Sequence, residues 1–391
     1  MNYKQSVYTI QLKYIEDDFE YVIDSFSGER EENIITTKLN ICKSLFDELQ
    51  LKISTPYLVN LKDILRSFKK DLEKHEIRFS AFMSLHNEKV LIDNVKEDNR
   101  SYGLLRLIFK DIDNNMNVDD ISILSCDQDD VEDKINYYVK KNINIRYPQG
   151  TRTYVDFGRT PTILSPRASG YFIHEILGHT LEGDYYSYYK DKYANMKISE
   201  KLTVIDSVDG FSKLIGIQDY DDIGIKLKPL TLIKQGKLHN ILATKNEDSL
   251  DNKLYGVARR ESYKFDILPR MRGTYIQPID DMDQQEILNK YENAIFVDET
   301  FSGGVDQQTG NYSLIGNGFV IKNGDKQNFI GNLRITGNII KDLSSFDYIG
   351  KDFDMFGSYC RKFGQSVRVG LGGPTVSISS LAVKGDLYGR R

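Results

Sequence analysis

Tryptophan is absent from this 391-residue chain, and cysteine occurs only three times. Cys42, Cys126 and Cys360 are widely separated and odd in number, which is a poor disulfide framework. No run approaches the ~18 consecutive apolar residues that a membrane-spanning helix needs. The first residues, MNYKQSVYTI, lack the basic and apolar regions of a signal peptide. These absences predict a cytoplasmic protein with reduced thiols and no membrane partner.

An excess of positive charge is also lacking. The formal net charge is −5 and the isoelectric point about 5.7. No global basic field is therefore available to attract nucleic acid. Charged residues make up 28% and hydrophobic residues 40%, the balance expected of a globular protein. The length allows two or three domains.

The pattern of apolar residues and turn signals predicts an α+β fold. Residues 1–150 have a mixed α/β pattern, and residues 151–391 predict a large, mainly antiparallel β-rich C-terminal domain. One strong helix is expected near residues 167–182. Two hairpins are expected with Gln235-Gly236 and Asn323-Gly324 at their turns, because these residues tolerate positive φ.

The stretch YFIHEILGHTLEGD (171–184) holds His174, Glu175 and His179. In metalloprotease helices two histidines bind zinc, and the adjacent glutamate activates the attacking water. Here the histidines are five residues apart, so an ideal helix would point them about 140° from each other. A π-bulge would bring them together, and Gly178 offers backbone freedom for it. Two buried, hydrogen-bonded histidines are the alternative.

A zinc hydrolase needs a third protein ligand. Cys360 lies in SYCRKFGQ beside Arg361 and Lys362, whose charge would favour a thiolate. Taken alone, a buried or merely exposed thiol is the favoured reading of Cys360. Glu182 and Asp184 follow His179 and would either orient a ligand histidine or surround the helix end.

A local basic cluster holds Arg259, Arg260 and Arg270. Arginine forks suit carboxylates, so one of them is a candidate to hold a peptide terminus or to polarise an oxyanion. Pairing with Glu261 or another acid is the structural alternative. Tyr263 is a second candidate for the oxyanion, or it simply packs.

Gly303-Gly304 is a candidate for substrate binding through the backbone. Glycine lets another chain approach closely, which fits a cleft that binds an extended peptide by strand addition. An ordinary turn would have the same sequence.

Four segments in one order resemble the TldD/PmbA family of metallopeptidases, and the resemblance covers residues ~155–391. The segments are HEILGHTLEGD (174–184), YGVARRESYKFDILPRMRGTYIQP (255–278), FSGGVDQQTGNYSL (301–314) and SYCRKFGQSVRVGLGGPTVSISSLAVKG (358–385).

The resemblance implies one zinc ion per chain, held by His174, His179 and Cys360, with Glu175 as general base. It implies a peptidase that acts on small or unfolded peptides, in leader removal or in peptide degradation. It also implies a hetero- or homodimer with a TldD/PmbA-like subunit. The alternative function is a non-catalytic, peptide-binding partner subunit. A DNA-binding role, suggested by the family's older description as gyrase modulators, is disfavoured by the acidic net charge.

Overall fold

The computed structural model confirms the α+β class. It describes residues 2–15, 18–31, 34–37, 57–93, 96–110, 116–122, 128–145 and 152–388, except 212, 213, 215, 217, 218, 246–248 and 280. Cys42 and Cys126, and the limit predicted near residue 150, lie outside the described residues. Within these ranges no helix is long and apolar enough to cross a membrane.

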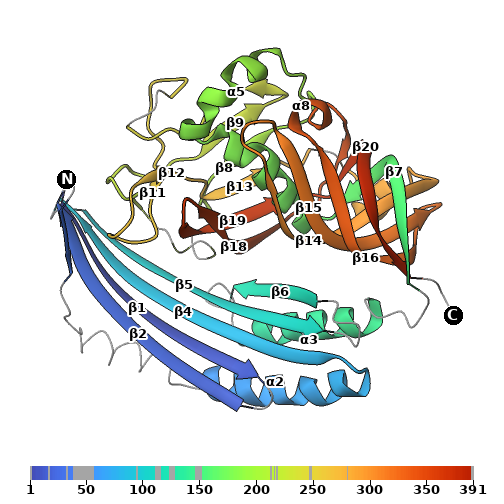
Figure 1. Cartoon of the computed structure of the whole chain (residues 1–391), viewed down its shortest axis with the longest axis horizontal. Coiled ribbons are helices and arrows are strands. Elements are labelled where there is room, and N and C mark those ends of the chain that lie inside the picture. Colours follow the sequence, from blue (N-terminus) through green and yellow to red (C-terminus); the bar gives the residue numbers. More distant parts are fainter. Residues whose placement is uncertain are drawn as a thin grey trace.

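The N-terminal part is a six-stranded antiparallel sheet in the order β3-β2-β1-β4-β5-β6, the curved lower layer of Figure 1. Two helices pack on one face, because alternate residues of β4 and β5, such as Phe79, Ala81 and Leu107, point into one core. The elements are β1 (Asn2–Ile15), β2 (Asp18–Glu31), β3 (Ile34–Thr37), α2 (Tyr57–Lys74), β4 (Arg78–Ile92), β5 (Lys96–Lys110), β6 (Met116–Ser122) and α3 (Gln128–Ile145).

The C-terminal part contains a sheet in the order β16-β15-β14-β7-β20-β17. An additional pairing of β16 with β20 closes five of its strands into a barrel. Only the β7–β14 pair is parallel, and it covers only Ile295–Val297 of β14. The elements are β7 (Arg152–Leu164), β14 (Asn293–Val305), β15 (Asn311–Lys322), β16 (Asp325–Asn338), α8 (Ile339–Asp342), β17 (Phe346–Ile349) and β20 (Val376–Tyr388).

A second C-terminal sheet, in the order β10-β9-β8-β13-β19-β18, presents β18 and β19 toward the N-terminal sheet (Figure 1). A short pair, β11-β12, stands beside it. The elements are β8 (Val204–Asp206), β9 (Leu230–Lys234), β10 (Lys237–Leu238), β11 (Ala258–Arg259), β12 (Leu268–Pro269), β13 (Gly273–Ile276), α7 (Gln284–Leu288), β18 (Asp354–Lys362) and β19 (Gln365–Gly373).

Both predicted hairpins are confirmed. Gln235 and Gly236 connect β9 to β10 with φ of 48° and 72°, and Asn323 and Gly324 connect β15 to β16 with φ of 51° and 83°. Positive φ at both central residues matches the right-handed twist of the strands.

The predicted helix is confirmed as a continuous helical segment between the two C-terminal sheets. Ser165 caps α4 (Pro166–Ile173), accepting a hydrogen bond from the Ala168 N–H, and Pro166 occupies the first turn. A β-carbon at Gly170 would lie 2.6 Å from the Gly372 nitrogen, so glycine is needed where α4 crosses β19. A further helix, α5 (Gly183–Asn195), follows and was not expected from the sequence.

Candidate metal centre

The predicted helix distortion is confirmed. His174–Gly178 form a π-helical turn, in which the backbone N–H of His179 donates to the carbonyl of His174, five residues earlier. His179–Leu181 continue as a 3₁₀ turn. The extra residue rotates His179 onto the face of His174, and the two ring centroids lie 5.0 Å apart.

Gly178 has a different reason for being glycine from the one expected. Its φ and ψ are both −54°, an ordinary helical conformation open to any residue. A β-carbon there would lie 2.0 Å from Sδ of Met271, which is fully buried. Space, and not backbone freedom, therefore requires glycine at this position.

We expect Gly178→Ala to lower the free energy of unfolding by about 1–3 kcal/mol, because Met271 must move within a packed core. Chemical denaturation would measure the change. Gly304→Ala is the matched control, since a β-carbon there meets nothing within 4 Å. Equal stability of the two variants would contradict the steric account.

Three potential ligands converge beside the π-helical turn. One ligand atom from each of His174, His179 and Cys360 lies within 4.8 Å of the other two. Sγ of Cys360 is 3.3 Å from Nε2 of His179. All three side chains are buried, with exposures of 2%, 8% and 3%. Cys360 comes from β18, so the cluster joins the helix to the second C-terminal sheet.

This donor set fits a zinc ion. Around a tetrahedral zinc with bonds of about 2.0–2.3 Å, nitrogen and sulfur ligands lie roughly 3.3–3.8 Å apart, close to the separation found here. Nδ1 of His174 is buried and has no hydrogen-bond partner among the described residues. Burying a polar nitrogen without a partner costs free energy. Coordination of a metal ion would satisfy an imidazole nitrogen in such a place.

Charge within the cluster favours the thiolate form of Cys360. Burial alone would raise the pKa of Cys360, but His179 and His174 outweigh it and hold that pKa well below its usual value. Burial would lower the pKa of His179, whereas Cys360 and Glu182 raise it. The thiolate that a metal requires is therefore the stable form of Cys360.

Glu182 orients the second histidine. Its carboxylate accepts a hydrogen bond of 3.0 Å from Nδ1 of His179, which directs Nε2 toward Cys360. Lys362 Nζ donates to Glu182 at 2.9 Å and to Asp184 at 2.7 Å. Burial would raise the pKa of Glu182, but His179 and Lys362 lower it to about 2.

Lys362 was expected to act on the thiolate, and its geometry assigns it a different role. Residues alternate across β18, so Cys360 and Lys362 point inward while Arg361 is exposed. The ammonium of Lys362 contacts the two carboxylates, and the histidines stabilise the thiolate.

We expect Glu182→Gln to weaken zinc binding by about 10–100-fold, because the amide cannot hold the His179 ring as a carboxylate does. Competition with a chromophoric chelator would measure the dissociation constant. Glu292→Gln, at an exposed position just before β14, provides the control. An unchanged dissociation constant for zinc in Glu182→Gln would show that the contact between Glu182 and His179 contributes to the fold and not to metal binding.

Glu175 faces an open cavity of about 380 Å³ next to the cluster. The cavity is lined by both His174 and Glu175. Burial raises the pKa of Glu175, although His179 and His174 oppose that rise. A carboxylate with a raised pKa is a better proton acceptor at neutral pH. The remaining lining residues are Arg106, Val118, Arg167, Tyr171, Thr300, Phe301, Ser302, Phe356, Ser358, Tyr359 and Leu371.

The three candidate arginines lie in different places. Arg270 is fully buried beneath the cluster, and its Nη2 donates to the carbonyl of Cys360 at 2.5 Å. Arg259 donates to the carbonyl of Met271, and burial lowers its pKa to about 9. Neither Arg259 nor Arg260 lines the large cavity; both line a separate one of about 40 Å³.

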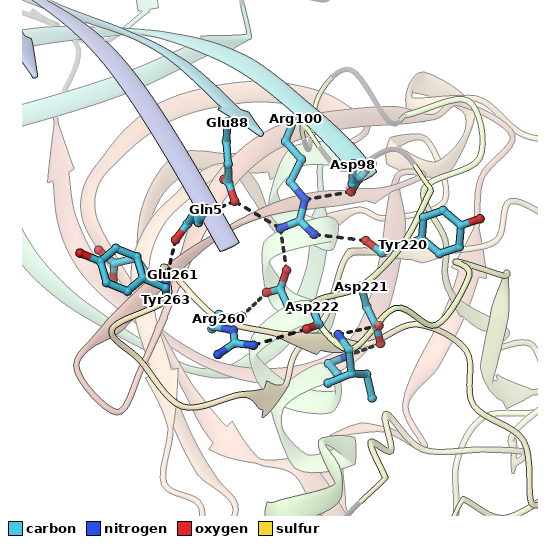
Figure 2. Close-up of polar contacts among 12 residues, drawn as sticks. Gln5, Glu88, Asp98, Arg100, Tyr220, Asp221, Asp222, Arg260, Glu261 and Tyr263 are labelled. Carbon is cyan, nitrogen blue, oxygen red and sulfur yellow. Dashed lines mark hydrogen bonds and ion pairs between the residues drawn. The ribbon is translucent and has the colours of Figure 1, made fainter. Parts of the chain in front are cut away.

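Arg260 and Tyr263 lie where the N-terminal sheet meets the C-terminal part (Figure 2). Arg260 donates through its backbone N–H to Asp222, which also pairs with Arg100 of β5. The backbone N–H of Tyr263 donates to Gln5, and its ring packs with apolar residues of β4. Their contacts hold the two parts of the chain together.

Gly303 and Gly304 belong to β14 and pair with Leu314 and Ser313 of β15. The residues immediately before them, Thr300–Ser302, line the cavity. The turn alternative is therefore wrong, and the position beside the cavity is compatible with binding of an extended chain.

Sequence reasoning missed Arg106 and Arg167, which line the cavity. Arg167 could have been proposed as a site residue from its position, since it lies two turns before His174 in the same helical segment. The position of Arg106 in the sequence does not indicate a site residue, because only the packing of the N-terminal sheet brings Arg106 to the cavity.

These features define an α+β protein with a buried His/His/Cys cluster next to a carboxylate-bearing cavity. The sequence profile of the PmbA/TldA metallopeptidase C-terminal domain matches residues 157–385. The chain thus belongs to the TldD/PmbA family of metallopeptidases.

Relatives agree with this assignment. A metalloprotease of Methanocaldococcus jannaschii is 34% identical over 56% of this chain and 49% of its own length. A zinc metalloprotease TldD homolog of Saccharolobus solfataricus is 30% identical over 58% of this chain and 52% of its own. The matched segment thus spans about half the length of these relatives. The crystal structure of TldE from Thermococcus kodakarensis has the same fold, with a TM-score of 0.64, 12% identity and coverage of 98% of this chain and 96% of its own.

Proposed function

We propose that this protein is a zinc-dependent peptidase that hydrolyses small or unfolded peptides. The observation that carries the proposal is the cluster of His174, His179 and Cys360, whose ligand atoms lie within 4.8 Å of one another beside Glu175. Bound zinc would polarise the scissile carbonyl and increase the acidity of the attacking water.

The residues of the chain then have distinct tasks. Glu175 accepts the proton of the attacking water and delivers it to the leaving amine. Glu182 keeps the His179 ring in one orientation, and Lys362 keeps Glu182 ionised. Arg270 supports the third ligand through the Cys360 carbonyl.

An extended substrate is favoured by the stretch of β14 that follows Val297. Because β7 pairs with β14 only over Ile295–Val297, the following residues have β15 on one edge and no strand of the described chain on the other. Thr300–Ser302 on this stretch line the cavity. A peptide that adds as a strand here is held through its backbone, so unfolded chains of many sequences would bind.

The biological roles that fit such an activity are leader removal from a precursor peptide and degradation of small peptides. A homodimer or a heterodimer with a TldD/PmbA-like subunit is the proposed assembly, suggested by the family and by the TldE-like fold. The cytoplasm is the proposed compartment, since reducing conditions keep a cysteine ligand available.

The test is hydrolysis of a peptide mixture by zinc-loaded protein, followed by mass spectrometry of the products. We expect cleavage of unstructured peptides and no cleavage of a stably folded protein of the same composition. The alternative, a non-catalytic peptide-binding subunit, predicts zinc and peptide binding with no product, alone or with zinc in excess.

A further inference from the structure

The cavity beside Glu175 contains two arginines that come from different parts of the fold. Arg106 lies on β5 of the N-terminal sheet, and Arg167 lies in the first turn of α4. Among the described residues that line the cavity, Glu175 is the only acidic one. Both arginines therefore line the space in which a substrate would lie to reach Glu175.

Arg167 is held in place by aromatic rings. Its guanidinium lies over the ring of Phe356 at 4.2 Å and over that of Tyr138 at 5.7 Å. A guanidinium stacked on a ring still donates its N–H groups in its own plane. This stacking fixes the position of the donor before any ligand arrives, which reduces the entropy lost on binding.

Among the described residues, the one carboxylate within ion-pair distance of Arg167 pairs with it only weakly. Nη1 of Arg167 is 4.0 Å from Oδ2 of Asp354, too long for a hydrogen bond, and the Asp354 side chain is 50% exposed. Such an exposed pair contributes little and is readily exchanged for a better acceptor. A ligand carboxylate in the cavity would provide that acceptor.

We propose that Arg167, together with Arg106, forms a carboxylate-binding subsite that makes the peptidase selective for peptides with a carboxylate at a set distance from the cleaved bond. This inference rests on the proposed function and adds a substrate class to it. The carboxylate belongs either to an aspartate or glutamate side chain or to the C-terminus of the peptide. Both have the planar pair of oxygens that an arginine fork binds.

The helix sets the distance between the subsite and the reacting bond. Eight residues separate Arg167 from Glu175, a rise of about 12 Å along the helical segment. An extended peptide advances about 3.3 Å per residue. The bound carboxylate thus lies roughly three to four residues from the cleaved bond.

Matched peptides test the subsite. One series consists of amidated Ala/Ser decapeptides in which a single glutamate, or glutamine as its neutral match, moves along the chain. The second series has no acidic side chain and ends in a free carboxylate or an amide. Mass spectrometry of the products gives the cleavage site and kcat/KM for each peptide.

We expect kcat/KM for the preferred acidic peptide to exceed that of its neutral match by about 10–100-fold. The series in which the preference occurs identifies the source of the carboxylate. In Arg167→Gln this ratio falls toward one, while Arg334→Gln, an exposed arginine on β16, keeps it. Equal rates for acidic and neutral peptides, or a ratio that persists in both Arg167→Gln and Arg106→Gln, would overturn the subsite.

Binding separates this inference from the proposed activity. Fluorescence anisotropy with zinc-loaded Glu175→Gln protein compares labelled acidic and neutral peptides without turnover. If the wild-type protein hydrolyses no peptide, the peptidase proposal fails, and a tenfold tighter binding of the acidic peptide that is lost in Arg167→Gln still supports the subsite. Equal binding of the two peptides refutes the subsite whatever the activity.

Discussion

Replacing Glu175 with glutamine is expected to reduce peptide hydrolysis by about 10²–10⁴-fold while zinc remains bound. Glutamine has nearly the same shape but cannot accept the proton of the attacking water. Glu175 lines the cavity next to His174 and is absent from the three-residue ligand cluster, so metal binding does not depend on it. Initial rates on one unstructured peptide, with metal content measured on the same sample, would check both parts.

Glu200→Gln offers a control at an exposed carboxylate of the same part of the chain. If the Glu175 variant keeps full activity, another group takes the proton and the proposed mechanism is wrong. If it loses zinc together with activity, Glu175 acts on the metal site and its role as a base is unsupported.

Substituting a proposed ligand is expected to remove the metal itself. Purified wild-type protein, loaded with zinc and desalted, should retain about one zinc per chain by elemental mass spectrometry. His174→Ala and Cys360→Ala should each retain almost none, because two remaining ligands do not hold zinc against dilution. Since binding of the ion stabilises the folded state, their melting temperatures should also stop responding to added zinc.

His239→Ala, at an exposed histidine outside the cluster, controls for loss of adventitious zinc. Retention of one zinc by Cys360→Ala would show that the sulfur is not a ligand. Absence of zinc from the wild-type protein would favour a site that a partner subunit completes.

The helix carrying the two histidines could be predicted with its distortion, because a shared ligand site requires the two rings to lie on one face of the helix. A five-residue spacing on one segment has few ways to bring His174 and His179 to one point, and the π-helical turn is one of them. Predicting Cys360 as a ligand required more than its local sequence. Its own neighbours left a buried thiol as the better reading, and only the ordered motifs of a family joined it to the helix.

The contacts that support the cluster could not be predicted. The pairing of Lys362 with Glu182 depends on which face of β18 points inward, and Arg106 depends on the packing of the N-terminal sheet. Arg260 and Tyr263 could not be placed from the sequence either. They lie within four residues of Arg259, but their partners Asp222 and Gln5 hold them at the junction with the N-terminal sheet (Figure 2).

The N-terminal sheet supplies part of the cavity wall. Arg106 and Val118 come from β5 and β6, outside residues 157–385 that match the family profile, whereas His174, Glu175, His179 and Cys360 lie within it. The proposed catalytic residues thus lie within the matched segment, whereas the cavity wall combines residues inside it, Arg167 among them, with residues outside it. Exchange of the first six strands between relatives should change which peptides are hydrolysed and leave the proposed metal ligands and general base in place.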